Sequence, residues 1–246
     1  MTIPNPTGLL DGITAGIIVI TGIIFGALSF YNAKKLGARL LYFAGILVIV
    51  VGLLWLGPFT EFLTYLFLGE HLPGEVYGWL SYIWVVPGIT LAIYIGGELL
   101  VPDKKKILVS IYIVLGIIFL LWMFIFPNGN VGEDIGLFEP TALGTFEWVE
   151  PETGELVNTD FPTSPAYILI IIFLLSVLVF DSIGFAIKAK QSTGALRTKF
   201  LYLSIGFGIF FVCGALDSVF PVAFYTGIVR GVMATFAIWT YLGLKT

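Results

Sequence analysis

The residues Arg230, Asp181 and Asp217 lie within or beside long apolar stretches of this chain. Arg230 lies in YTGIVRGVMATFAIWTYLGLKT, Asp181 lies in VLVFDSIGF, and Asp217 ends the apolar run that precedes Pro221. A charge near the centre of a bilayer costs roughly 2.5 to 17 kcal/mol, depending on how the cost is measured. An arginine does not readily shed its proton. Arg230 therefore requires an anionic partner inside the protein.

The two aspartates are the candidate partners. At about 1.5 Å per residue, Asp181 lies about 10 Å along its helix from Lys188, and Arg230 lies about 14 Å beyond Pro221. The long arginine side chain and helix tilt can close the remaining difference in depth, so we expect Arg230 to pair with Asp181. Asp217 is the alternative partner, toward which the guanidinium can extend. The pair forms either a switch or anion site, or a static tie between helices.

Residues for catalysis or metal binding are scarce. The chain has one cysteine, Cys213, and one histidine, His71, which excludes an intrachain disulfide and a Cys/His metal cluster. The apolar stretches contain no paired carboxylates and no Ser/His/Asp arrangement. We therefore expect no enzymatic activity, no metal site and no cofactor.

The composition indicates that lipid is the solvent for most of the chain. Of the 246 residues, 58% are hydrophobic and 11% are charged, and the charges are collected between long apolar runs. The sequence predicts an all-α, polytopic bundle of seven transmembrane helices, a single domain over residues 1–246, in the cell membrane. The runs long enough to cross about 30 Å of hydrocarbon lie near 9–30, 38–57, 78–100, 107–126, 165–187, 199–217 and 222–243.

The basic residues predict the orientation of the bundle. All but one of the 12 Lys and Arg residues lie in alternate loops or at the C-terminus, whereas the intervening loops contain acidic residues and no base. By the positive-inside rule the basic side is cytoplasmic, with the N-terminus outside and the C-terminus inside. The residues concerned are Lys34, Lys35, Arg39, Lys104, Lys105, Lys106, Lys188, Lys190, Arg197, Lys199 and Lys245.

The segment 127–163 is long, acidic and expected outside the cell. Within it, TFEWVEPETGELVNTD, residues 145–160, places a turn containing Pro and Gly between two short stretches of Thr, Val and aromatic residues. This pattern predicts an outer β-hairpin between the fourth and fifth helices. The hairpin is either a cap over the bundle or a solvated acidic loop whose removal leaves the bundle folded.

Two pairs of spans resemble each other at an offset of four helices. RLLYFAGILVIVVGLLWLG matches KFLYLSIGFGIFFVCGALD, and VVPGITLAIYIGG matches IVRGVMATFAIWTYLG. The match predicts two parallel three-helix units joined by the fourth span, and chance similarity between apolar helices explains it equally well. The alignment sets Pro87 opposite Arg230. Tyr82 and Trp84, just before Pro87, either line a cavity or pack in the core.

Seven spans in about 250 residues resemble a broad group of membrane proteins. The group includes microbial rhodopsins, small sugar-efflux transporters with a Pro-Gln motif, and the seven-helix input modules of prokaryotic sensor kinases. The stretches ARLLYFAGILVIVVGLLWLG and YGWLSYIWVVPGITLAIYIGGELL are most similar to uncharacterised archaeal seven-helix membrane proteins.

The departures from these families narrow the expected function. Retinal needs a lysine in the seventh span, where the only base is Arg230, and the chain contains no Pro-Gln pair. Sensor modules transmit their signal to an attached cytoplasmic domain, whereas this sequence ends shortly after Gly243. We therefore expect any signal to pass through a separate partner protein.

We therefore expect a sensor or receptor-like module that binds a small or lipidic ligand and acts through a cytoplasmic signalling partner. A small-solute transporter built from parallel repeats, and a structural or assembly subunit of a membrane complex, are the alternatives. The expected partners are the lipid bilayer, the ligand and the signalling protein. Oligomers are compatible with this interpretation, and nucleic acid is not an expected partner.

The orientation can be tested with single cysteines introduced at positions 35, 105, 130 and 152 in a Cys213→Ser background. An impermeant thiol reagent added outside intact cells should label the cysteines at 130 and 152 only, because these positions lie on the acidic side. Labelling of the cysteines at 35 and 105 from outside would contradict the predicted topology.

Overall fold

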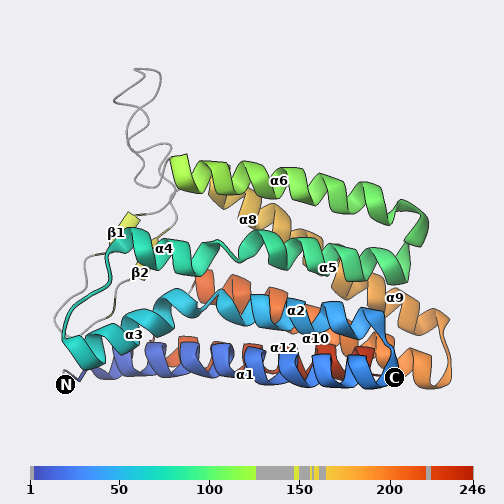
Figure 1. The fold of residues 1–246 in the computed structure, drawn as a ribbon, viewed down its shortest axis with the longest axis horizontal. Coiled ribbons are helices and arrows are strands. Elements are labelled where there is room, and N and C mark those ends of the chain that lie inside the picture. Colours follow the sequence, from blue (N-terminus) through green and yellow to red (C-terminus); the bar gives the residue numbers. More distant parts are fainter. Residues whose placement is uncertain are drawn as a thin grey trace, which may run out of the picture.

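A computed structural model describes residues 3–125, 147–149, 156, 158–160, 165–219 and 223–245. In this part of the chain, long helices lie side by side in an elongated bundle (Figure 1). Six helices are long and apolar enough to cross a membrane, and a bent pair makes a seventh. The helical class and the number of candidate spans agree with the sequence prediction.

The candidate spans are built from single helices and from consecutive pieces. They are α1 (Pro6–Leu36), the bent pair α2 (Arg39–Leu53) and α3 (Leu56–Leu68), α4 (Gly74–Tyr82) with α5 (Val85–Leu100), η1 (Pro102–Lys104) with α6 (Lys105–Ile125), α8 (Pro165–Ser176) with η2 (Val177–Ile183) and α9 (Gly184–Gln191), α10 (Gly194–Val219), and α11 (Ala223–Ala234) with α12 (Phe236–Leu244).

Successive spans alternate in direction, so the chain starts at one end of the bundle and finishes at the other (Figure 1). The α1–α2, α5–α6 and α9–α10 turns and the C-terminal residues all lie at one end, and these segments carry the lysines and arginines other than Arg230. We call this the basic end. The opposite end, with the N-terminus and the α3–α4 turn, is called the acidic end.

The first helix begins and ends at residues suited to those positions. Asn5 caps α1, with its side-chain oxygen accepting a hydrogen bond from the backbone N–H of Gly8 at 2.8 Å, and Pro6 follows at the first helical position. Gly37 ends the helix with a φ of 65°, a left-handed conformation that glycine adopts at little cost. These signals fix the length of α1.

Two spans break just before a proline. The α2–α3 pair bends by 47° at Leu54 and Trp55, and α4 gives way to α5 at Ile83 and Trp84. A proline lacks a backbone N–H and is tolerated in the first turn of a helix. Pro58 and the proline of α5 occupy such positions after the breaks.

The proline of α3 also explains an error in the expected second span. The span was predicted to end at residue 57, but the helix restarts and continues to Leu68. Glu61, which the charge pattern placed in an outer loop, therefore lies in α3 and is fully buried.

The fifth span contains a π-helix, η2, between α8 and α9. Short π-helical turns inserted in α-helices are rare and occur frequently at functional sites. This segment holds Asp181.

Two three-residue strands lie between α6 and α8. β1 (Glu147–Val149) pairs antiparallel with β2 (Asn158–Asp160), with Trp148 opposite Thr159. The connecting turn of the predicted hairpin lies outside the described residues except for Leu156, so the hairpin stays a prediction. Leu156 is buried with Phe62 and Tyr65 of α3. At least this residue packs on the bundle, which the interpretation as a wholly solvated loop did not anticipate.

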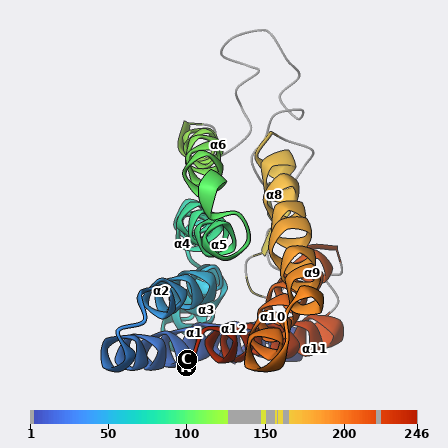
Figure 2. The same cartoon turned by 90° about the vertical axis from the view of Figure 1, so that its right-hand side faces the viewer.

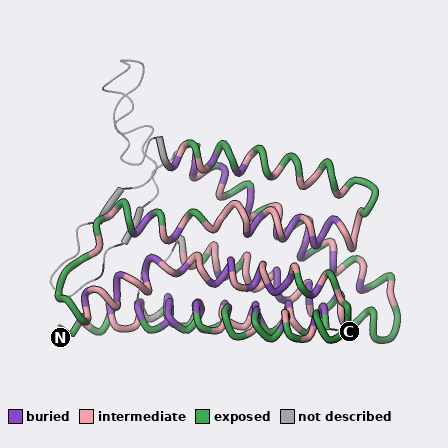
Figure 3. The backbone as a smooth tube through the Cα atoms, in the orientation of Figure 1, coloured by how far each residue is buried: buried purple, intermediate pink, exposed green. Residues whose placement is uncertain are grey.

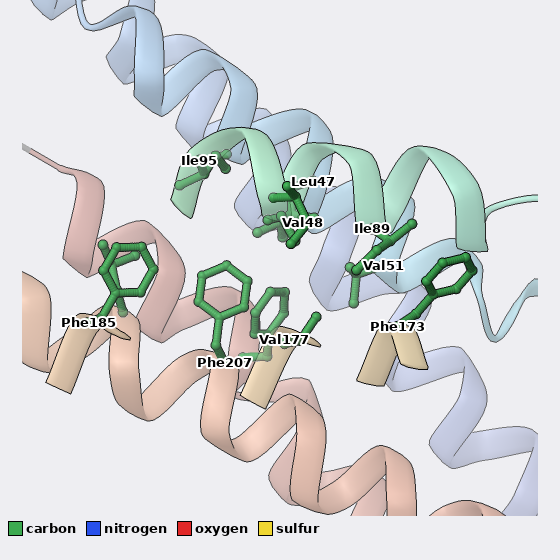
Figure 4. Packing of buried hydrophobic residues seen from close by; sticks show 14 of the residues in the cluster. Leu47, Val48, Val51, Ile89, Ile95, Phe173, Val177, Phe185 and Phe207 are labelled. Carbon is green, nitrogen blue, oxygen red and sulfur yellow. The ribbon is translucent and has the colours of Figure 1, made fainter. Parts of the chain in front are cut away.

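The main apolar core runs along the bundle axis between the two halves of the chain. Figure 4 shows side chains of α2 and α5 facing side chains of α8, η2, α9 and α10. Few of the described side chains of α6, the helix farthest from α1 in the end-on view, are buried (Figures 2 and 3). Exposed isoleucines such as Ile107 and Ile117 suit a lipid-facing helix. The core residues labelled in Figure 4 are Leu47, Val48, Val51, Ile89, Ile95, Phe173, Val177, Phe185 and Phe207.

Glycines set the contact between α1 and α2. A Cβ atom on Gly22 would lie 2.9 Å from the carbonyl oxygen of Val48 and 3.0 Å from Cα of Gly52, both backbone atoms. The helices thus approach closely at a small-residue face, as expected for membrane helices. By contrast, a Cβ atom on Gly231 of α11 would meet nothing within 4 Å.

We predict that Gly22→Ala destabilises the bundle, because the backbone of α2 must move to admit the methyl group. Overpacking of this kind costs about 1 to 3 kcal/mol in soluble proteins. Gly231→Ala is the matched control, and it should leave stability unchanged or raise it slightly through better helix propensity. Thermal unfolding in detergent, followed by fluorescence, would measure both effects. Equal melting temperatures for the two variants would contradict the close contact.

Candidate functional site

Arg230 lies in α11 toward the acidic end and binds two aspartates. Its Nε donates to Oδ1 of Asp217 at 2.9 Å and to Oδ2 at 3.2 Å. Its Nη1 donates to the carboxylate of Asp11 and to the Asp11 carbonyl oxygen, the latter at 3.3 Å. The arginine side chain is 11% exposed. The charge of Arg230, which would be costly in the hydrocarbon of a bilayer, is thus balanced by carboxylates inside the bundle.

A tryptophan completes this group. The indole Nε1 of Trp55, at the bend between α2 and α3, donates to Oδ2 of Asp217 at 3.3 Å. We call Asp11, Trp55, Asp217 and Arg230 together the Arg230 node. The node joins α1, α10 and α11 to the bend of the second span.

The structure corrects the expected pairing of Arg230 with Asp181. The guanidinium extends toward the acidic end, where Asp217 and Asp11 lie close to the ends of their helices. Asp181 lies in the half of its span nearer the basic end, beside Gly96 of α5. The alternative partner, Asp217, is therefore the one found. The comparison of depths along the helices led to the wrong partner because the Arg230 side chain extends toward the acidic end. It does not approach Asp181 through helix tilt.

Sequence reasoning missed Asp11. It lies near the start of the first span, in GLLDGITAG. A signal was present, because the predicted topology puts this part of the first span at the same end of the bundle as Asp217. The pairing itself depends on α1 lying against α11, where Leu10 contacts Gly227, and the sequence does not specify that neighbour.

The node has the properties of a structural tie. Charge-assisted hydrogen bonds are stronger than neutral ones. Arg230 donates to two carboxylates, and the exposed fractions of their side chains are 27% for Asp11 and 13% for Asp217. Their partial exposure at the acidic end reduces the cost of the extra negative charge. Nothing in this geometry requires a ligand to complete it.

A second buried carboxylate forms another tie near the acidic end. Oε1 of Glu61 lies 2.6 Å from Nδ1 of His71, and Oε2 accepts the backbone N–H of Leu72 at 2.7 Å. The His71 ring stacks on Tyr65, with centroids 4.7 Å apart. This group fixes the α3–α4 turn to α3.

Asp181 has a different environment. It is 0% exposed, and neither carboxyl oxygen has a hydrogen-bond partner among the described residues. A Cβ atom on Gly96 would overlap Oδ1 of Asp181, so the carboxyl group lies directly against the backbone of α5. The ring of Phe180 also contacts this position. An ionised carboxylate held in such a setting without a partner is strongly disfavoured.

The neighbour of Asp181 links the π-helix to α10. Ser182 Oγ donates to the carbonyl oxygen of Ser204 at 3.0 Å. Gly208 also lies against this serine. The π-helix is therefore hydrogen-bonded to α10 on one side, and it presents an unsatisfied carboxyl group to α5 on the other.

The remaining candidate residues lie near the break between α4 and α5. Tyr82 packs against the main apolar core. Trp84 lies at the break, and its indole N–H is buried without an acceptor in the described part of the chain. Pro87 lies in the first turn of α5. Within the described residues, Trp84 and Pro87 therefore take no part in the hydrogen bonds of Arg230.

Comparison with known proteins adds no family assignment, because the sequence matches no protein-family model and no curated protein sequence.

Double-mutant cycles should separate the two carboxylates. We expect Arg230→Met and Asp217→Ala to interact by about 0.5 to 3 kcal/mol, because each removes one half of the same ion pair. Arg230→Met and Asp181→Ala should add to within about 0.5 kcal/mol, since they share no partner. The free energies of unfolding in detergent would be compared. Additive effects for Arg230 and Asp217 would show that the node does not form.

Proposed function

We propose that this chain is a sensor or receptor-like membrane module whose responsive element is the contact between Asp181 in η2 and Gly96 in α5. The observation that carries the proposal is the complete burial of a carboxyl group with neither oxygen partnered among the described residues. Buried polar groups in native proteins nearly always have a partner. An intramembrane ionisable residue without one is a candidate for function.

The surrounding backbone supports a responsive role. Asp181 lies in a π-helix, a geometry less favourable than the α-helix. A second packing of this segment that gives the carboxyl group a partner would recover part of the cost of burial. Two packings close in free energy are what a switch requires. A small or lipidic ligand, or a proton, that binds one packing better would shift the balance.

The position of Asp181 suggests how a change would reach a partner. The segment continues directly into α9, which carries Lys188 and Lys190 in its last turn. Ser182 connects the same segment to α10. A rearrangement of η2 would therefore move the α9–α10 turn. With the N-terminus outside and the C-terminus inside, as the charge pattern predicts, this turn faces the cytoplasm and a signalling partner there.

A transporter is the second candidate function, and the broken helices favour it. Discontinuous helices near the bilayer centre form the substrate sites of many transporters, and this chain breaks at Leu54, Ile83 and Thr235. Against it, Arg230 is 11% exposed and bound by two aspartates, so its charge is not available to a solute.

Spin labels on Lys35→Cys and Lys190→Cys in a Cys213→Ser background would test the sensor proposal. The protein in nanodiscs should show two interlabel distance populations by pulsed electron paramagnetic resonance. Their ratio should change by about fivefold or more between acidic and alkaline buffer, the lower end of typical coupling. Asp181→Asn, which cannot ionise, should abolish the change. Asp103→Asn, at an exposed position of η1, is the matched control and should retain it.

An unchanged distance distribution in the parent protein, or an equal response in Asp181→Asn, would contradict the sensor proposal. The transporter candidate predicts a further result. A cysteine in place of the buried Met233 would then react with hydrophilic thiol reagents applied from either side of the membrane, whereas the sensor proposal expects reaction from neither side.

A further inference from the structure

The α1–α2 turn at the basic end lies beside a cavity that is open to the surface and that the proposed function does not use. Its volume is about 410 Å³. Helices α1 and α2 meet here at Gly37, where a Cβ atom would have nothing within 4 Å. The cavity is lined by Phe30, Ala33, Lys34, Ala38, Arg39 and Tyr42.

The walls of the cavity are largely aromatic and aliphatic. The rings of Phe30 and Tyr42 are tilted against each other with centroids 5.0 Å apart. Ala33 and Ala38 add small apolar surfaces. These side chains suit a hydrocarbon chain, and they offer little to a fully hydrated ion.

The charged groups at the cavity are of one sign. Lys34 and Arg39 both line it, and in the part of the chain that the structure describes neither forms an ion pair with a carboxylate. The Arg39 guanidinium lies over the Phe43 ring at 5.7 Å, which holds it beside the cavity. Two bases without counter-charges favour an anionic occupant.

The start of α2 adds hydrogen-bond donors to the same place. Its N-cap residue is Ala38, which supplies no side-chain acceptor for the N–H groups of the first turn. Uncapped N–H groups at a helix N-terminus bind phosphate and other anions. Ala38 and Arg39, at the start of α2, line the cavity together with Lys34.

We propose that this cavity binds an anionic phospholipid. The phosphate lies between Lys34, Arg39 and the first turn of α2, and an acyl chain lies along Phe30 and Tyr42. The apolar walls and the location at the end of two candidate spans, where a bilayer has its polar interface, favour a lipid over a free phosphate ion. The site is independent of the sensor proposal, since a transporter or an assembly subunit could hold the same lipid.

The test is lipid binding to delipidated protein, measured by native mass spectrometry. The probes are an anionic phosphatidylglycerol, a phosphatidylcholine with the same acyl chains, and inorganic phosphate. We expect one phosphatidylglycerol to bind with an affinity at least about tenfold higher than that of phosphatidylcholine, given two bases at the membrane surface. The double variant Lys34→Gln/Arg39→Gln should lose about tenfold in affinity for phosphatidylglycerol. Tyr42→Ser, which removes an apolar wall, should weaken lipid binding as well.

The matched control is Lys190→Gln/Arg197→Gln, which removes two bases from the α9–α10 turn at the same end of the bundle. It should bind phosphatidylglycerol as the parent protein does. An equal loss in this control would show general attraction to the basic end and would overturn the site. Binding of inorganic phosphate as tight as that of the lipid would overturn the lipid assignment. Failure of phosphatidylglycerol to bind the parent protein would overturn the proposal altogether.

Discussion

The interior of a bilayer offers no hydrogen bonds, and the placement of each buried ionisable group in this bundle follows from that fact. A charged residue in a candidate span must find its partner within the protein or reach an interface. Arg230 does both, because it extends toward the acidic end and meets Asp217 and Asp11 there. The positions of α1, α10 and α11 at that end are therefore coupled through one guanidinium. Moving any of these helices alone would separate a buried charge from its partner, which costs about 3 to 5 kcal/mol in soluble proteins.

The same constraint gives Asp181 its significance. Its carboxyl group is more deeply buried than the aspartates of the Arg230 node, yet it has no partner among the described residues. A residue kept only for stability would be replaced with advantage by an apolar side chain of similar volume, as buried ion pairs often can be. Gly96 shows that the neighbouring helix leaves room for the carboxyl group, since any larger residue would displace it. The local structure thus accommodates a destabilising group, which favours a functional over a structural role.

The helical class and the number of candidate spans were predictable from the sequence because they depend on local properties, namely the length and polarity of each apolar run. The end of the second span was not, since the span was predicted to end at residue 57, whereas Pro58 lies in the first turn of a helix that continues to Leu68. Of the two partners of Arg230, Asp217 was predicted as the alternative and Asp11 was not predicted. Depth along a helix constrains which residues can meet, but the neighbour relation between α1 and α11 that brings in Asp11 is a property of the packed bundle. For the same reason, no feature of VLVFDSIGF alone indicates that Asp181 faces a glycine and not a base.

The two ends of the bundle differ in how firmly the helices are held, and this difference bears on mechanism. At the acidic end the Arg230 node connects α1, α10 and α11 with the bend of the second span, and Glu61 bonds His71 of the α3–α4 turn. Toward the basic end, Lys105 pairs with Glu98 between the adjacent helices α5 and α6, and Asn32 bonds Tyr241 between α1 and α12. Neither of these contacts crosses from α5 to η2, where Asp181 meets Gly96. Alternating access requires that each end of a bundle open in turn, whereas a signalling module needs movement only at the end that its partner reads. In this bundle, ion pairs connect helices at the acidic end, whereas no such pair among the described residues joins α5 to η2. This arrangement fits movement at one end, as in a signalling module, better than the opening of both ends in turn.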